Sequence, residues 1–286
     1  MTHINSFNSI INNLNSFWEN NGCVILQPYD SEMGAGTFHP ATFFNSFIGN
    51  KFRGAYTQLS KRPFDIKYNT NSNKSSIFHQ YQVIIKPACK NIDQLYLLSL
   101  KKIGINVTTN EIKFVEDNWK SPTLGASGIG WEVRLNGVEI TQFTYFQHMG
   151  SIECNPVMVE ITYGLERLAL HLQNITNINK LIYNKTKFNT LTYGDLFSNY
   201  EKDYANYISN NLNITFLLNE FNMLEKQCGY LLNNNLFFLA YDYIIKLSHI
   251  FNLIDSNICY GFIKYDYISR IRYLVNKIAI KVKKNE

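Results

Sequence analysis

The segment EITYGLERLAL, residues 160–170, spaces one acidic and one basic side chain in a way that suits the binding of a cation and an anion together. Glu160, Thr162 and Gly164 lie two residues apart, so on a strand they face the same side. Arg167 follows three residues after Gly164, where the apolar residues change to helical spacing. The segment therefore predicts a strand that turns directly into a helix. A cation and a polyphosphate can be bound side by side at such a junction.

This segment resembles motif 3 of the class II aminoacyl-tRNA synthetases, usually written GxGxGxxR. In that family the final Arg, here Arg167, lies against ATP, and the glycines leave room for the substrates. The chain keeps Gly164 but has Glu160 and Thr162 where the first two glycines would stand. Filled positions make the amino-acid pocket smaller and negative, which suits the ammonium of an amino acid without a side chain. Single-chain glycyl-tRNA synthetases are similar here, so the resemblance implies that Glu160 and Thr162 bind glycine.

Two strands joined by a polar loop are predicted within residues 54–87. Arg62 stands at the end of the first strand, with Lys61 beside it. The second strand alternates, and it carries one aromatic residue on each face: Phe78, Gln80 and Gln82 on one face and Tyr81 on the other.

These strands resemble motif 2, where an Arg on the first strand grips the α-phosphate and the amino-acid carboxylate. The resemblance implies this role for Arg62, with Lys61 as the second choice. An aromatic residue on the second strand of motif 2 stacks on adenine, which implies Phe78 or Tyr81 here. The sequence does not choose between them, because a shift of register by one residue would exchange their faces. Two amides of this strand would also line the ATP site: Gln80 and Gln82.

A hairpin is predicted around Asn136-Gly137, between the alternating segments that span residues 130–147. The second of these strands resembles one in alanyl-tRNA synthetases that carries an acidic residue and an amide for the metal and the substrate. This resemblance implies that Glu139 holds Mg²⁺, which prefers carboxylate oxygens and bridges phosphates. It also implies that Gln142 contacts the amino acid. Two further residues are candidates for the pocket: Trp119 and Glu132.

Two glycine-rich segments are expected beside the site. Residues 29–42 predict a shaped loop, in which the roles of three polar residues stay unassigned: Glu32, Thr37 and His39. Residues 123–130 match neither a Walker loop nor a Rossmann turn, and we interpret them as a turn that lets the backbone approach the ligand.

The N-terminal segment predicts an amphipathic helix over residues 4–18, ended by Gly22 and followed by a strand that Pro28 stops. A long helix followed by such a strand resembles motif 1 of the class II synthetases. In that family motif 1 builds the dimer interface. The resemblance therefore implies a homodimer formed through residues 4–28.

The composition of the 286 residues, 45% hydrophobic and 17% charged, indicates a globular protein. The net charge of +5 is compatible with a nucleic-acid partner, although a solvated basic surface explains it as well. No C-x-x-C pair and no secretory signal occur, which argues against a zinc site or disulfides and favours a cytoplasmic location. The apolar stretch near 236–254 is interrupted by Asp242, Lys246 and His249, and it predicts a buried helix rather than a membrane span.

The pattern becomes helical after about residue 175. With the three motifs, the resemblance implies an α+β fold, in which residues 1–175 form a class II synthetase core with an antiparallel sheet flanked by helices. Residues 176–286 would form a helical C-terminal domain.

Over nearly all of residues 5–280 the chain most resembles the α subunits of bacterial two-subunit glycyl-tRNA synthetases. The resemblance implies ATP-dependent formation of glycyl-adenylate with Mg²⁺, and transfer of glycine to tRNA(Gly). It also implies a separate β subunit that brings most tRNA contacts, in an α2β2 assembly. Two alternatives are a paralogue that activates a small amino acid for another acceptor and a non-catalytic regulatory subunit. The presence of Arg62, Glu139 and Arg167 disfavours the second.

Overall fold

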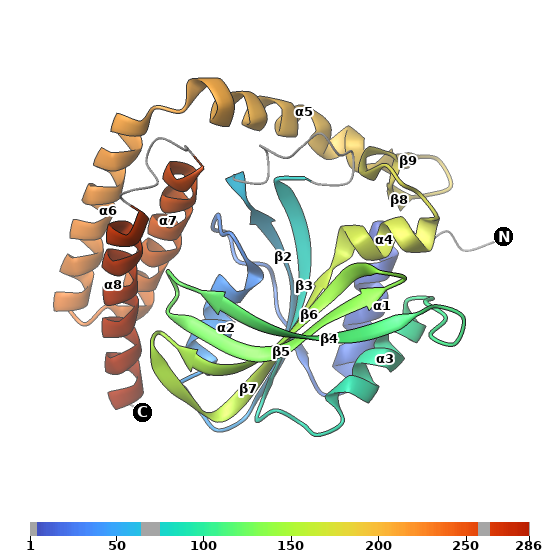
Figure 1. Cartoon of the computed structure of the whole chain (residues 1–286), viewed down its shortest axis with the longest axis horizontal. Coiled ribbons are helices and arrows are strands. Elements are labelled where there is room, and N and C mark those ends of the chain that lie inside the picture. Colours follow the sequence, from blue (N-terminus) through green and yellow to red (C-terminus); the bar gives the residue numbers. More distant parts are fainter. Residues whose placement is uncertain (1–4, 64–74, 257–263, 286) are drawn as a thin grey trace.

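A seven-stranded sheet organises the chain in the computed structural model, which describes residues 5–63, 75–256 and 264–285 (Figure 1). The strand order is β1-β2-β3-β7-β6-β5-β4, and every neighbouring pair is antiparallel except β1 with β2. The strands are β1 (Val24–Ile25), β2 (Phe52–Lys61), β3 (Ile77–Lys86), β4 (Ile112–Ser121), β5 (Ala126–Leu135), β6 (Val138–Met149) and β7 (Ile152–Gly164). A small separate hairpin has the strands β8 (Ile182–Lys185) and β9 (Thr190–Thr192).

Helices cover both faces of this sheet, and most of the later ones stand together at one side of it (Figure 1). The first four are α1 (Phe7–Asn20), α2 (Pro40–Asn45), α3 (Ile92–Lys102) and α4 (Leu165–Gln173). The C-terminal four are α5 (Tyr193–Asn206), α6 (Ile214–Asn233), α7 (Phe237–Asp255) and α8 (Lys264–Lys284). The predicted α+β fold with a helical C-terminal region is confirmed.

Each face of the sheet has its own hydrophobic core, because alternate residues of a strand point to opposite faces. The face under α1, α3 and α4 buries large side chains that include Trp18, Tyr81, Tyr96 and Tyr163. The opposite face is covered in part by α2 and by α6, α7 and α8. That second core joins sheet residues to the helices and includes Tyr56, Ile84, Phe146, Phe221 and Tyr241.

Several predicted turns lie where the sequence indicated. Asn136 and Gly137 have φ values of 50° and 84°, which only a few residue types adopt readily, and they join β5 to β6. Gly22 ends the first helix region with a φ of 83°. The strand of residues 160–164 turns directly into α4, so Arg167 lies in the first turn of that helix as predicted.

Two apolar residues of the helices lie outside the cores. Leu98 on α3 and Phe216 on α6 are 50% and 59% exposed. On both helices, the neighbouring elements cover a narrower part of the surface than the apolar stripe occupies. The basic segment near the C-terminus belongs to α8, and Val282 within it is buried. The hairpin of β8 and β9 was not predicted.

The glycine-rich segment 123–130 is a turn only at its beginning, because β5 starts at Ala126. Its last glycine lies against the neighbouring strand: a Cβ added at Gly130 would stand 2.1 Å from the carbonyl oxygen of Phe143 in β6. The interpretation of the whole segment as a turn that lets the backbone approach a ligand is therefore wrong for Gly130. Close contact between strands explains this glycine.

The substitution Gly130→Ala is expected to lower the free energy of unfolding by about 2 to 3 kcal/mol, because β6 cannot give way without breaking the sheet. Gly229 is the matched control, since a Cβ there would meet nothing within 4 Å. Gly229→Ala in α6 is expected to raise the free energy of unfolding by up to about 1 kcal/mol. Urea unfolding of both variants measures the difference. Equal effects of the two substitutions would contradict the strand contact.

The helix α7 is long and apolar enough to cross a membrane by length and composition alone, the one such helix among the described residues. Its most apolar window is 67% buried within the protein. It packs through Tyr241, which stacks on Phe43 of α2 with ring centroids 4.2 Å apart. The expected buried helix is confirmed. The four described cysteines are all free: Cys23, Cys89, Cys154 and Cys228.

Candidate active site

A row of polar side chains crosses the middle of the sheet on the face towards the C-terminal helices. The register pairs Tyr56 with Gln82, Gln82 with Thr162, Thr162 with Gln142, and Gln142 with Glu132. Residues paired across a ladder point to the same face, so the five strands β2, β3, β7, β6 and β5 present these side chains together. Glu160 lies two residues from Thr162 on β7 and shares this face.

Glu160 is a buried carboxylate with one unpaired oxygen. The residue is 1% exposed, and Thr37 Oγ1 donates a hydrogen bond to its Oε2 at 2.7 Å. Its Oε1 is buried and has no hydrogen-bond partner among the described residues. Burial raises the pKa of Glu160 to about 7, although the neighbouring hydroxyls of Thr37 and Thr162 act in the opposite direction. A buried acceptor without a donor is costly, so this oxygen is suited to a small cationic ligand.

Gln82 supplies the complementary unpaired donor. Its Oε1 accepts a hydrogen bond from Thr162 Oγ1 at 2.6 Å, which fixes the amide. Its Nε2 is buried without an acceptor in the described part of the chain. Gln82 and Glu160 lie on adjacent strands, so an unpaired N–H donor and an unpaired carboxylate oxygen share one face. This grouping associates Gln82 with Glu160 and Thr162, whereas the sequence had placed it at the ATP site.

The short segment η1 (Gly36–Phe38) covers this polar row. Gly36 N donates to Gln80 Oε1 at 2.7 Å, and Tyr56 Oη donates to Gly36 O at 2.9 Å. A Cβ on Gly36 would stand 2.4 Å from Gln82 Nε2, so only glycine allows this approach. The segment thereby brings Thr37 onto Glu160. Gln80 is occupied in holding the segment, since Ser60 Oγ also donates to its Oε1 at 3.0 Å.

The three unassigned polar residues of segment 29–42 have different surroundings. Thr37 belongs to the site through its bond to Glu160. His39 caps α2, because its Nδ1 accepts from Ala41 N at 3.0 Å. Glu32 pairs with Lys61 and lies 3.3 Å from Nε2 of His249 in α7.

Arg62 and Phe78 lie together at the ends of β2 and β3. The Arg62 guanidinium carbon stands 4.7 Å from the centroid of the Phe78 ring, a cation–π contact. Arg62 Nε also donates to Gly34 O at 3.0 Å. Lys61, the second choice for the phosphate-binding role, points instead to Glu32 and donates to Tyr200 Oη at 2.9 Å.

Tyr81 lies on the opposite face of the sheet. It is fully buried in the core under α1, and its hydroxyl donates to Asn15 Oδ1 at 3.0 Å. No ligand on the polar face can reach this ring. The structure therefore excludes Tyr81 as a stacking residue and leaves Phe78, which is partly exposed on the polar face.

Arg167 and Glu139 form a direct ion pair. Arg167 Nη1 donates to Glu139 Oε2 at 2.7 Å and to the carbonyl oxygen of Glu139 at 2.8 Å. Both side chains are partly exposed, 45% and 40%, and line an open cleft of about 790 Å³ beside His171. The predicted anion-binding and cation-binding groups are thus adjacent.

The remaining predicted residues form walls or paired groups. Gln142 Nε2 donates to Phe143 O at 2.9 Å. Glu132 accepts two hydrogen bonds from Arg134, at 2.8 and 3.2 Å, and these lower the pKa of Glu132. Trp119 is partly buried and meets Phe146 edge to face at 5.8 Å.

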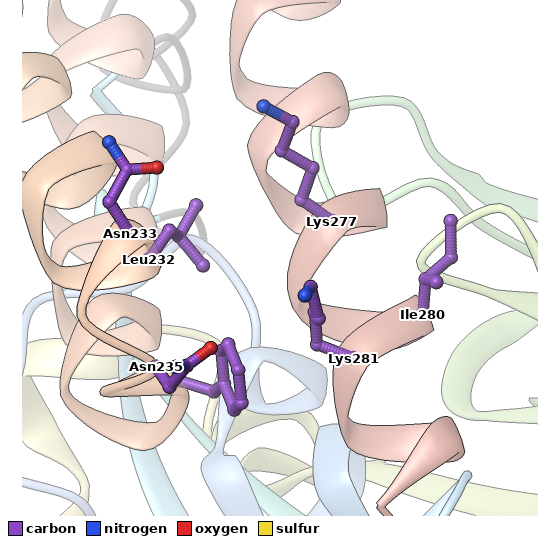
Figure 2. Close-up of a pocket in the computed structure, with 7 residues that line it drawn as sticks. Leu232, Asn233, Asn235, Lys277, Ile280 and Lys281 are labelled. Atoms are coloured by element: carbon purple, nitrogen blue, oxygen red, sulfur yellow. The ribbon is translucent and has the colours of Figure 1, made fainter.

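A second pocket, of about 290 Å³, lies away from all these residues, between the α6–α7 connection and α8 (Figure 2). In Figure 2, Lys277 and Lys281 of α8 stand across from Leu232 and Asn233. The pocket contains none of the predicted site residues.

Comparison with known proteins identifies the family. A model of the glycyl-tRNA synthetase alpha subunit matches residues 7–286. The glycine–tRNA ligase alpha subunit of Petrotoga mobilis is 48% identical over 252 residues, which cover 88% of this chain and 86% of that protein. Two structures of pyrrolysyl-tRNA synthetase from Desulfitobacterium hafniense are also similar, with TM-scores of 0.45 and 0.46 and identities of 10% and 11%. They cover 60% and 65% of this chain, and 70% and 76% of their own. The family model and the Petrotoga relative show that the chain belongs to the glycyl-tRNA synthetase alpha subunit family.

Proposed function

We propose that this chain is the catalytic subunit that activates glycine with ATP and transfers it to tRNA(Gly). One observation carries the proposal: the unpaired carboxylate oxygen of Glu160 and the unpaired amide of Gln82 share one buried face. A free amino acid carries an ammonium and a carboxylate, which are the complements of these two groups. Thr37 and Thr162 orient them through hydrogen bonds of 2.7 and 2.6 Å.

The size of the pocket supports glycine over other amino acids. Glu160 and Thr162 fill positions where many class II synthetases have glycine, and Tyr56 and Gln82 stand beside them without exposure. Every competing amino acid is larger than glycine, so a small pocket excludes them by collision. For the same reason, the proposal requires no editing site.

The first chemical step joins a glycine carboxylate oxygen to the α-phosphorus of ATP, and the bond to the bridging oxygen breaks to release pyrophosphate. Two anions must approach one another, so the site has to supply positive charge and alignment. Arg62 beside Phe78 would hold the α-phosphate, and Arg167 the outer phosphates. In the second step, a terminal tRNA hydroxyl attacks the carbonyl carbon of the adenylate, and AMP leaves.

The carboxylate of Glu139 fits a role in holding Mg²⁺, which keeps most of its waters and needs only one or two carboxylates plus substrate phosphates. The described residues contain no group of three or more His, Cys, Asp or Glu side chains that could hold a metal alone. Bound there, Mg²⁺ would neutralise charge on the phosphates. The ion pair with Arg167 would keep Glu139 in position until ATP arrives.

Membership in an alpha-subunit family supports a partner β subunit, with the α2β2 stoichiometry as our proposal. We also propose that α1 and β1, within residues 4–28, form the contact between two α subunits. All proposed catalytic residues precede residue 176, so we propose residues 1–175 as the catalytic part and 176–286 as the helical part. A translation enzyme of this kind would work in the cytoplasm.

Amino-acid-dependent exchange between ATP and pyrophosphate tests the function, with the chain alone and with its β subunit, across glycine, alanine and serine. Exchange with glycine only, followed by charging of tRNA(Gly) when the β subunit is present, would support the proposal. Glycine exchange without any charging would favour the paralogue with another acceptor. Absence of exchange with every amino acid would favour the regulatory alternative.

Phe78→Ala is expected to raise the KM for ATP about tenfold, because base–aromatic stacking is worth about 1 to 3 kcal/mol. Tyr81→Phe is the matched control on the same strand. It loses only the bond to Asn15, which should lower the free energy of unfolding by about 1 kcal/mol and leave the KM for ATP unchanged. Exchange kinetics at varied ATP and urea unfolding measure the two effects. A raised KM in Tyr81→Phe would contradict the assignment.

A further inference from the structure

The strand that carries Phe78 runs past the end of its neighbour. β7 pairs with β3 only from Gln80, opposite Gly164, to Ile85, opposite Val159. The chain turns into α4 at Gly164, so no described strand continues beside residues 76–79 on that side. Backbone N–H and C=O groups left without partners in a protein interior are costly, and they are nearly always satisfied in some other way.

Three side chains take the place of the missing strand. Glu166 Oε1 accepts from His79 N at 2.7 Å. Glu201 Oε1 accepts from Ile77 N at 2.8 Å, and its Oε2 accepts from Ser76 N at 3.2 Å. The hydroxyl of Tyr193 lies 3.3 Å from Ile77 O and donates to Glu166 Oε1 at 2.9 Å. Side chains from two helices thus complete the hydrogen bonding of this edge.

Two of these side chains come from one face of α5, the first long helix of the C-terminal region. Tyr193 and Glu201 are eight residues apart, which places them on the same side of a helix. In Figure 1, α5 crosses beyond the ends of β2 and β3. Burial and the Glu166 charge raise the pKa of Tyr193 far above its usual range, so its hydroxyl keeps the proton that it donates.

Glu201 also holds the side chains of this segment. Its carboxylate accepts from Ser75 Oγ at 2.5 Å and from Ser76 Oγ at 2.9 Å. The carbonyl oxygen of Ser76 accepts from Arg62 N at 2.7 Å, which ties the segment to β2. The backbone that Glu201 fixes therefore leads directly into Phe78 on β3, and it is hydrogen-bonded to Arg62, the residue after β2.

We propose that Glu201 is a positioning residue for ATP binding, acting through the Phe78 ring. This inference rests on the proposed function and extends the site to a helix outside the catalytic sheet. Glu201 fixes the backbone directly before Phe78, and Glu166 fixes it directly after, so the ring is held where it can stack. Misplacement of a binding group by about 1 Å can cost up to about 100-fold in rate, so a single carboxylate can matter at this distance.

Glu201→Ala in the full chain with its β subunit is expected to raise the KM for ATP by about 10-fold in glycine-dependent exchange. The KM for glycine should stay within about twofold, since the glycine pocket lies on the central strands. Glu201→Gln keeps the size of the side chain but turns an N–H towards backbone donors. Its KM for ATP should lie between those of the wild type and Glu201→Ala. Asp203→Asn is the matched control, an exposed charge on the same helix, and should change neither KM.

A double-mutant cycle separates positioning from a general loss of stability. If Glu201 acts through Phe78, Glu201→Ala should have less than a twofold effect on the KM for ATP in a Phe78→Ala background. Additive effects of the two substitutions, or an equal rise in both KM values, would overturn the inference. Lack of glycine-dependent exchange in the unmodified protein would instead refute the proposed function, and direct ATP binding to the variants would then test Glu201 alone.

Discussion

Replacing Glu160 by Gln is expected to lower kcat/KM for glycine by about 10³-fold. The Glu160 oxygen without a partner is the one buried acceptor that we assign to the glycine ammonium. Truncating or neutralising one partner of a buried, hydrogen-bonded charge pair costs about 2 to 5 kcal/mol. The amide of Gln would keep the contact with Thr37 but lose the charge. Exchange kinetics at varied glycine measure the change, and kcat/KM for ATP at saturating glycine should fall less.

The matched control is Glu153→Gln, which removes an exposed carboxylate from the same strand and should leave kcat/KM unchanged. Retention of more than a tenth of the wild-type kcat/KM in Glu160→Gln would contradict the assignment of Glu160 to the ammonium.

Glu160→Gln should also reduce the pH dependence of the free energy of unfolding. Because burial raises the pKa of Glu160 to about 7, the folded state keeps this proton at pH values where the unfolded state has lost it. The free energy of unfolding should therefore fall as pH rises from about 4.5 to about 7, by about 3 kcal/mol from this group. Urea unfolding from pH 5 to 8 should show the fall in the wild type and a smaller one in Glu160→Gln. In the enzyme, kcat/KM for glycine should rise with pH through the same range, because the ammonium needs the ionised carboxylate.

Arg167→Ala is expected to lower kcat of glycine-dependent exchange by about 10³-fold while it leaves stability nearly unchanged. An arginine that stabilises charge on transferring phosphates contributes about 10³-fold or more to catalysis. Among the described residues, Arg167 bonds only Glu139, in an ion pair with both side chains partly exposed. Exposed pairs of this kind contribute about 0 to 1 kcal/mol, so the melting temperature should change little.

Arg272→Ala serves as the control for removal of a surface guanidinium. Arg272 lies on α8, away from the site, and its Nε donates to Ser151 Oγ at 2.8 Å. Arg167→Lys should recover little activity, because an ammonium lacks the planar fork that matches phosphate oxygens. Substantial exchange in Arg167→Ala, with full-length soluble protein, would remove Arg167 from the mechanism.

Alternation along the strands predicted much of the candidate site. The two-residue spacing of Phe78, Gln80 and Gln82 placed them on one face, and the register confirms it. The same spacing could not choose between Phe78 and Tyr81 as the stacking residue. That choice depends on which face of the sheet α1 covers, and α1 covers the face that carries Tyr81. The spacing also could not show which of the two amides, Gln80 or Gln82, is available to a ligand. Only the position of Gly36 shows that the first amide is occupied and the second has an unpaired N–H.

Contacts between distant segments could not be predicted from local pattern. Thr37 bonds Glu160 across 123 positions, and Glu201 bonds Ser76 across 125. Neither Thr37 nor Glu201 stands in a motif whose spacing indicates a partner. The exposure of apolar helix residues could not be predicted for a related reason. Leu98 and Phe216 extend apolar stripes beyond the area that neighbouring elements cover.

The core that joins the sheet to α6, α7 and α8 also sets an order of events during biosynthesis. Tyr56, Ile84 and Phe146 are made before α6, α7 and α8. At about 5 to 20 residues per second, residues 165–284 take on the order of 10 s to translate. Early in that interval α1 and α3 already cover one face of the sheet, whereas on the other face only α2 is in place. Ribosome-associated chaperones would meet this half-covered sheet on every round of synthesis.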